Sequence, residues 1–323
     1  MVGGGIVSTL GVVVGQAGPW AWLSFVVASF VALLSGYSYV KLAKHYGEGG
    51  GAFTFLRKID ADGFAGGLSW VLIGGYVLTN AVYASTFGKY LGEVVGLGPW
   101  FPRVMAVTIV AAFVALNLRG AGAAGRVEVV LVWLKLVVLA GLAAWGLGRW
   151  DVPAISQGVT DAGPLTGLAD AASVFIAFEG FQWLTYDYDE LNAPDKTLPR
   201  VVMSSIVVVT ALYVAVAIGV AMLLGADTVV EHGEVTLALA SREAAGVVGL
   251  VIVTIAAAFS TGSAIHATLF STARLASLVA ENRELPAVFD HHNGAGVPVR
   301  AVLALGGCRV CGHRHAVHVG AGR

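Results

Sequence analysis

The sequence predicts an all-α integral membrane protein, and three observations lead to that class. Charged residues make up 12% of the 323-residue chain and hydrophobic residues 57%, whereas soluble domains carry about 25% charged residues. The mean hydropathy is +0.80. Long apolar runs recur along the chain, and about 20 apolar residues cross the ~30 Å hydrocarbon core of a bilayer. The formal net charge of −1 gives no electrostatic signal for a nucleic-acid partner. From the low charged fraction and the long apolar runs, we expect the chain to lie in lipid.

Eight apolar segments are expected to be transmembrane helices, and a ninth begins near Val297. The first segment is too short to cross a bilayer by itself. It does not have the pattern of a signal peptide, because no basic region precedes it and no small-residue cleavage site is evident. The eight segments are Val2–Val14, Trp20–Leu42, Phe64–Val95, Arg103–Leu118, Arg126–Leu147, Leu168–Leu184, Val201–Leu224 and Val247–Val279.

The Lys and Arg residues of the loops predict the orientation, because cytoplasmic loops carry an excess of basic residues. Loops on one side of the predicted helices carry ten basic residues, and loops on the other side carry four. We therefore expect a multi-pass protein of the cytoplasmic membrane with its N-terminus in the cytoplasm. The ten are Lys41, Lys44, Arg57, Lys58, Arg119, Arg126, Lys196, Arg200, Arg283 and Arg300; the four are Lys89, Arg103, Arg149 and Arg242.

Glycine interrupts two of the predicted helices. The first contains "GGGI" at Gly3–Ile6, and the sixth contains "VFIAFEGFQWL" at Val174–Leu184. Glycine permits backbone angles that end a helix, and irregular backbone at membrane depth is tolerated only where protein buries it or it lines a cavity. Two discontinuous helices five segments apart are typical of an inverted repeat with a binding site at the bilayer midplane. For either motif alone, a packing contact or a simple kink would be the better interpretation.

The broken ends also predict the chemistry of a ligand. Free N–H groups at the start of a half-helix attract an anion, and free carbonyl groups attract a cation. A zwitterion with a carboxylate and an ammonium group fits such a pair of ends. Glu179, in the second break, has two open interpretations: it faces water in the cavity, or it pairs with a cationic substrate.

Five motifs, in the right order, resemble those of the amino acid–polyamine–organocation (APC) superfamily of permeases. Gly3–Ile6 and Phe175–Phe181 resemble the breaks in helices 1 and 6 of that family. The other three are similar to the loop after helix 2, the loop after helix 6 and the cytoplasmic end of helix 8: His45–Lys58, Glu190–Arg200 and Ser271–Phe289.

This resemblance implies an inverted-repeat, LeuT-like transporter fold of five plus five helices. The permease domain would cover residues 1–305, with a first repeat at about 1–148 and a partial second repeat at about 168–305. It also implies secondary active transport of amino acids or related amines, coupled to protons and working by alternating access, with no enzymatic activity and no cofactor. The substrate carboxylate would bind N–H groups of the first break and its ammonium group would bind carbonyls of the second, under Phe178 as an aromatic lid. The expected substrate-binding residues are Gly3, Gly4, Gly5, Ile6, Phe175, Ala177, Phe178 and Gly180.

Proton coupling is expected at Lys135, in "VWLKLVVLAGL" of the fifth segment. The resemblance places this lysine where sodium-coupled relatives hold a cation, and Ser260 and Thr261 of the eighth segment resemble the hydroxyl pair of the same place. Lys135 would gain and lose a proton during transport. For the two hydroxyl groups, hydrogen bonds to carbonyls of their own helix are an equal alternative. His266 is expected to form an interhelical hydrogen bond.

Both ends of the chain depart from the family pattern. Only Met1 and Val2 precede the first break, and the chain stops soon after entering the ninth helix, whereas family members usually have twelve. We therefore expect a chain truncated at both ends. Residues 306–323 hold both cysteines and three of the eight histidines, and this tail is interpreted as aberrant, frameshifted or otherwise unrelated coding sequence. The alternative function is accordingly a non-functional fragment of such a permease.

The tail has a second, less favoured interpretation. Its cysteines and two of its histidines are ligand types that zinc prefers, so a membrane metalloprotein is a further alternative. Their spacing does not match that of known zinc fingers, and no metal site is predicted. The four residues are Cys308, Cys311, His313 and His315.

Overall fold

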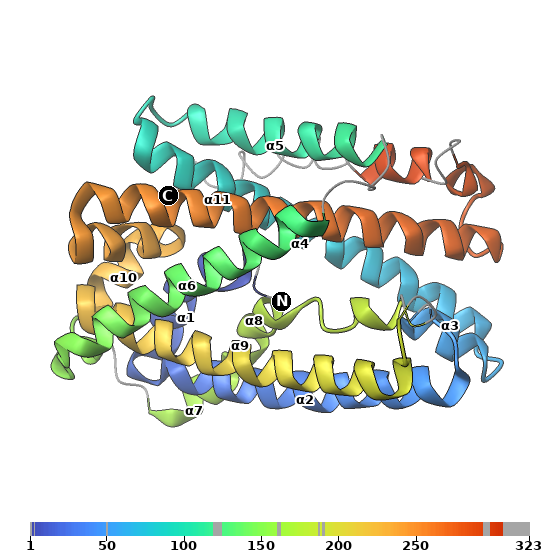
Figure 1. Ribbon diagram of the computed structural model, residues 1–323, viewed down its shortest axis with the longest axis horizontal. Helices are drawn as coiled ribbons and strands as arrows, with labels where there is room; N and C mark the ends of the chain where they lie inside the picture. The colour runs from blue at the N-terminus through green and yellow to red at the C-terminus, as the bar shows by residue number, and fades with distance from the viewer. Residues whose placement is uncertain are drawn as a thin grey trace, which may run out of the picture.

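A computed structural model describes residues 2, 4–49, 51–118, 125–159, 163–186, 188, 191–292 and 298–305. Within these ranges the chain is helical apart from its loops and one isolated antiparallel bridge between His292 and Pro298. The predicted all-α class is confirmed (Figure 1). The α-helices are α1 (Gly4–Ala17), α2 (Ala21–Tyr46), α3 (Gly51–Arg57), α4 (Asp62–Val95), α5 (Phe101–Leu118), α6 (Gly125–Arg149), α7 (Pro164–Ala169), α8 (Ala171–Phe175), α9 (Pro194–Leu224), α10 (Ala226–His232) and α11 (Thr236–Glu281). Short 3-10 helices lie between them: η1 (Gly18–Trp20), η2 (Pro153–Ser156), η3 (Ile176–Phe178), η4 (Trp183–Thr185), η6 (Gly233–Val235) and η7 (Ala287–Asp290).

Six helical stretches in the described ranges are long and apolar enough to cross a membrane, rather than the eight expected. The predicted first and second segments fall within one stretch, because η1 joins α1 directly to α2. The predicted sixth segment is not among the six, because it is divided into short helices. The six stretches are Gly4–Tyr46, Asp62–Val95, Phe101–Leu118, Val132–Arg149, Pro194–Leu224 and Ala226–Glu281.

Two helix boundaries show how local sequence decides where a helix starts. α9 begins at Pro194, ahead of the predicted Val201, because proline is tolerated in the first turn of a helix and Asp195 there complements the helix dipole. α11 has non-helical backbone at Ala245 and Gly246, so its second, apolar part begins at Val247, as predicted.

The sixth segment breaks where the sequence predicts. Its first half consists of α7, α8 and η3, and the chain then leaves helical geometry at Glu179, where φ is −53° and ψ is 144°. Gly180 follows with φ of 109°, a backbone conformation that glycine adopts without steric cost. The segment resumes as η4.

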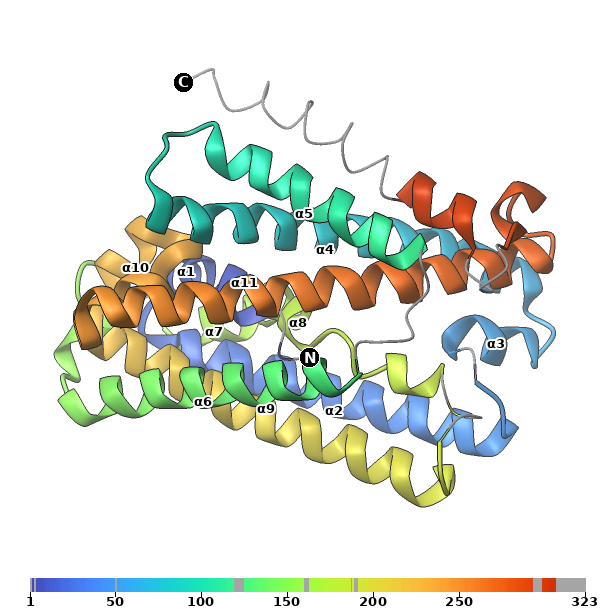
Figure 2. The ribbon, with the colours of Figure 1, turned by 45° about the horizontal axis from the view of Figure 1, so that its top comes forward.

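The long helices pack in pairs around the broken elements. α4 lies along α11, and α9 lies along both α2 and α6. α1 contacts α2, α4, α8, α11 and η3, so the first element of the chain lies inside the bundle. In the view of Figure 1, α1 and α8 lie between α11 and α2, and Figure 2 shows the same bundle after a turn of 45°.

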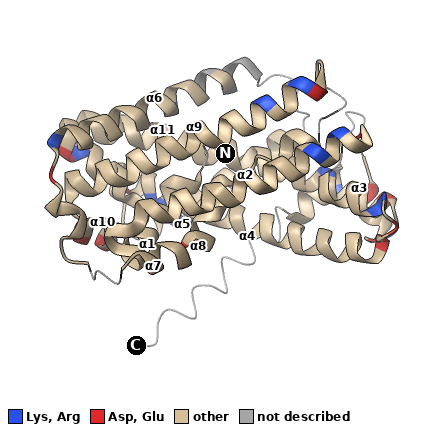
Figure 3. Cartoon of the chain, turned by 90° about the horizontal axis from the view of Figure 1, so that it is seen from below, with Lys and Arg blue, Asp and Glu red and all other residues tan. Residues whose placement is uncertain are grey.

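Basic residues gather at one end of the bundle. We call this end, formed by α3, the end of α2, the start of α9 and the end of α11, the α3 end. The opposite end, at α10, is the α10 end. Most Lys and Arg residues lie at the α3 end (Figure 3), as the count of basic loop residues predicts.

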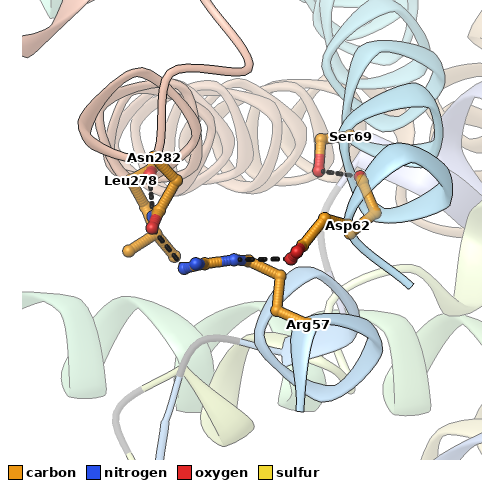
Figure 4. Close-up of polar contacts among 6 residues, drawn as sticks. Arg57, Asp62, Ser69, Leu278 and Asn282 are labelled. Carbon is orange, nitrogen blue, oxygen red and sulfur yellow. Dashed lines mark hydrogen bonds and ion pairs between the residues drawn. The ribbon is translucent and has the colours of Figure 1, made fainter. Parts of the chain in front are cut away.

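At the α3 end, Arg57 connects three helices (Figure 4). Its Nε lies 3.1 Å from Asp62 Oδ1 at the start of α4, and its Nη1 donates a hydrogen bond to Asn282 Oδ1 after α11. The guanidinium group also lies over the ring of Phe53, 5.8 Å from the centroid. These contacts attach the short helix α3 to the ends of α4 and α11.

At the α10 end, Glu234 of η6 connects the turn after α10 to α4. Its carboxylate lies 2.8 Å from Lys89 Nζ and accepts a hydrogen bond of 3.2 Å from Thr86 Oγ1. On the other side of the same turn, an ideal Cβ on Gly11 of α1 would stand 2.4 Å from Gly233 Cα. The turn is therefore packed between α1 and α4.

Candidate functional site

The first turn of α1 and the broken sixth segment meet inside the bundle. An ideal Cβ built on Gly5 would stand 2.4 Å from Ala177 Cα, closer than Cβ atoms approach other atoms in proteins. Only glycine allows this backbone-to-backbone contact between α1 and η3. The structure thus brings together Gly5 and Ala177, which the sequence analysis assigned to one substrate site.

The first turn of α1 carries the N–H groups that the sequence analysis assigned to a carboxylate. Gly4, Gly5 and Ile6 lie in this turn, where backbone N–H groups have no acceptor within the helix. The Ser8 hydroxyl donates to the carbonyls of Gly4 (2.8 Å) and Gly5 (3.1 Å), and the Thr9 hydroxyl donates to the carbonyl of Gly5 (2.9 Å). These bonds hold the turn in helical geometry. Gly3 lies outside the described residues.

The first half of the sixth segment is anchored by Tyr213 of α9, which the sequence analysis did not single out. Its hydroxyl donates to the carbonyl of Ala177 at 3.2 Å. Its ring meets the ring of Phe178 edge to face, with the centroids 5.5 Å apart. A carbonyl has two acceptor lone pairs, so the Ala177 oxygen can accept a second hydrogen bond, from a ligand. Tyr213 is one of several aromatic residues in apolar helices, and periodicity alone does not separate it from the others.

A cavity of about 400 Å³ lies beside the break. It is bounded by α4, α6, α9, α11 and the sixth segment, and its wall is mainly apolar. Of the predicted site residues it exposes Gly180 and Lys135; Phe178 is fully buried against Tyr213 and is not among the described lining residues. The polar side chains of the lining are Tyr83, Lys135, Glu179, Trp183, Ser205 and Ser263.

Lys135 reaches this cavity from α6, although its exposed fraction is only 6%. α6 contacts α11, which carries the two predicted hydroxyl groups, and both Ser260 and Thr261 are buried. Thr261 Oγ1 donates to the carbonyls of Ala257 (2.8 Å) and Ala258 (3.2 Å). For Thr261 the structure therefore contains the alternative that the sequence analysis kept open, a bond to its own helix. The roles of Lys135, Ser260 and Thr261 in proton coupling stay predictions.

Gln182 closes the break itself. Its Oε1 accepts a hydrogen bond from the Gly180 N–H at 3.1 Å, and its Nε2 donates to the Tyr76 hydroxyl at 3.2 Å. A side chain two residues beyond the glycine thus satisfies a backbone donor that the broken helix leaves free, and attaches the turn to α4. Sequence reasoning missed this residue because a glutamine in an apolar segment has many possible partners.

Two smaller predictions can be compared with the structure. His266 of α11 lies 3.0 Å from Asn117 Nδ2 of α5, so the predicted interhelical hydrogen bond is confirmed. The Cys and His residues of the tail, considered as zinc ligands in the less favoured interpretation, lie outside the described residues. One described group, Glu281, Asp290 and His292, has ligand atoms within 4.8 Å of one another. Both ring nitrogens of His292 already lie within hydrogen-bond distance of oxygen atoms, Asp290 O at 3.2 Å and Ser277 Oγ at 3.1 Å.

Several apolar helices of membrane-spanning length, packed around a broken segment, define a multi-pass membrane protein. The chain belongs to the amino acid permease family, whose model matches residues 1–312. It is 31% identical over 298 residues to an uncharacterized protein of Methanocaldococcus jannaschii, covering 90% of this chain and 67% of that protein. It is 29% identical over 296 residues to the inner membrane transport protein YbaT of Escherichia coli, covering 90% and 68%. Over 296 residues it is 24% identical to the serine/threonine exchanger SteT of Bacillus subtilis, covering 88% and 66%. The predicted family is confirmed.

Proposed function

We propose that this chain is a secondary active transporter of amino acids or related amines that is coupled to protons and works by alternating access. The observation that carries the proposal is the contact between Gly5 and Ala177, which joins the first turn of α1 to the broken sixth segment beside a cavity. The family supports transport of amino acids. The name of YbaT supports transport, and the name of SteT supports serine and threonine as substrates of a relative.

The substrate is proposed to bind through its backbone groups. N–H groups in the first turn of α1 would hold the carboxylate, because the N-terminus of a helix favours an anion. Carbonyls at Phe175 and Ala177 would hold the ammonium group. The cavity of about 400 Å³ has room for an amino acid of ordinary size.

Lys135 is the proposed proton carrier. Protonated, its ammonium group would occupy the place of a bound cation and hold α6 against the first break and α11. Deprotonated, it would release these elements and allow the two halves of the bundle to move. Residues of about 1–148 and 168–305 are the two halves in this scheme, and the α3 end faces the cytoplasm.

Uptake by the purified protein in liposomes, under an imposed proton gradient, tests this function. Labelled amino acids should accumulate, and unlabelled amino acid should compete. The corresponding amino acid amide should fail to compete, because a buried donor left without its partner costs about 1–3 kcal/mol. Equal competition by the acid and the amide would indicate an amine transporter, and absence of any uptake or binding would contradict the proposal.

A further inference from the structure

Glu179 is the only carboxylate among the described side chains that line the cavity. It stands at the point where the sixth segment leaves helical geometry, directly before Gly180. Because the backbone is extended there, the side chain leaves the helix axis instead of following the face of η3. It reaches the same space as Lys135 and Trp183.

The carboxylate of Glu179 has an acceptor position to spare. The Thr79 side chain of α4 hydrogen-bonds to it, while Oε2 is buried and has no hydrogen-bond partner among the described residues. A buried carboxylate is normally paired, because burying a charge without a partner is costly. A ligand group that donates a hydrogen bond would satisfy this oxygen.

The surroundings indicate what kind of donor fits. The wall beside Glu179 is apolar and includes Val132, Leu136 and Val208, so it suits the alkyl stem of a long side chain. In the proposed transport cycle Lys135 loses its proton. The Glu179 carboxylate is then the one charged group among the described residues that line the cavity. A cationic group at the end of an alkyl stem would neutralise it.

We propose that Glu179 selects substrates that carry a second, side-chain cation, so that this permease favours dibasic amino acids such as those with a guanidinium or a terminal ammonium group. The inference rests on the proposed function, because it assigns a substrate class to the same site. Glu179 would accept hydrogen bonds from the side-chain cation, while the two breaks hold the α-carboxylate and α-ammonium groups.

Binding of L-arginine and L-citrulline to the purified protein tests the inference, since the two have the same shape and citrulline is neutral at the end of its side chain. The wild type should bind arginine more tightly by about 30-fold or more, the range expected for a buried charged pair. In Glu179→Gln this ratio should fall towards one, and Glu179→Asp should keep a preference for arginine. Glu243→Gln, which changes an exposed carboxylate of α11, is the matched control and should leave the ratio unchanged.

Each outcome decides between the two proposals. If the wild type binds citrulline as tightly as arginine, the selectivity inference is wrong while amino acid transport stands, and this holds even if Glu179→Gln fails to fold. If Glu179→Gln folds, by its size-exclusion profile, and keeps the wild-type ratio, Glu179 does not recognise the cation. If the wild type binds neither compound and no other amino acid, both proposals fail.

Discussion

Gly5 of α1 and Ala177 of the sixth segment touch backbone to backbone, so that a Cβ on Gly5 would lie 2.4 Å from Ala177 Cα. The contact joins two elements that are far apart in the sequence. Because the facing atom belongs to the backbone, it cannot move aside as the end of a flexible side chain would. The position of the sixth segment against α1 therefore depends on this one glycine.

Gly5→Ala should push the sixth segment away from the first turn of α1 and lower both stability and substrate binding. Overpacking a buried contact costs about 1–3 kcal/mol, which thermal unfolding of the purified protein would measure. Gly74→Ala is the control, because a Cβ on that exposed residue of α4 would meet no atom within 4 Å. If both variants unfold at the wild-type temperature, the contact does not constrain the fold.

Tyr213→Phe should destabilise the first half of the sixth segment, which contains Ala177. The variant keeps the ring against Phe178 but removes the hydroxyl that donates to the Ala177 carbonyl. A buried acceptor that loses its donor costs about 1–3 kcal/mol, so unfolding should occur at a lower temperature. The same change at the exposed Tyr37 of α2 should have no measurable effect. Equal behaviour of the two variants would show that the hydroxyl is dispensable.

Lys135→Ala should abolish pH-dependent accumulation in liposomes while leaving some substrate binding. Lys135→Arg should not restore it, because a guanidinium group does not lose its proton in proteins. Lys41→Ala, at an exposed lysine of α2, is the control and should transport like the wild type. Accumulation by Lys135→Ala against a gradient, with the wild-type pH profile, would mean that the coupling group lies elsewhere.

The ion pair between Lys89 and Glu234 at the α10 end should contribute little to stability. Both side chains are partly exposed, and such pairs are worth about 0–1 kcal/mol. A double-mutant cycle with Lys89→Met and Glu234→Gln should give a coupling energy in that range. The coupling should shrink in about 1 M salt, where screening acts over about 3 Å. A larger coupling energy that is insensitive to salt would show that the pair is desolvated.

The proposed orientation predicts which end of the bundle faces the cytoplasm. In a background with Cys308 and Cys311 replaced by serine, a membrane-impermeant maleimide should label Glu231→Cys, at the α10 end, in intact cells. Lys44→Cys, at the end of α2, should be labelled only after the cells are opened. Both positions are exposed. Labelling with the opposite pattern would invert the orientation.

The sequence by itself determined the class of protein, the family, the approximate helices and the break in the sixth segment. These depend on local properties: apolar runs of membrane length, the freedom of the glycine backbone and the spacing of short motifs. The break at Gly180 and the apolar start of the second part of α11 at Val247 were predicted from the sequence for that reason. The Lys and Arg count also predicted the uneven charge of the two ends.

Only the tertiary structure decided which side chains meet. Tyr213 bonds to the carbonyl of Ala177, and Gln182 bonds to Tyr76, across more than 30 residues of chain in each case. Phe178, whose role as a lid over the substrate stays a prediction, packs against Tyr213, and Glu179 beside it lines the cavity. Local preference determines the course of the backbone through a break, but the direction in which each side chain then points depends on the helices that pack around it.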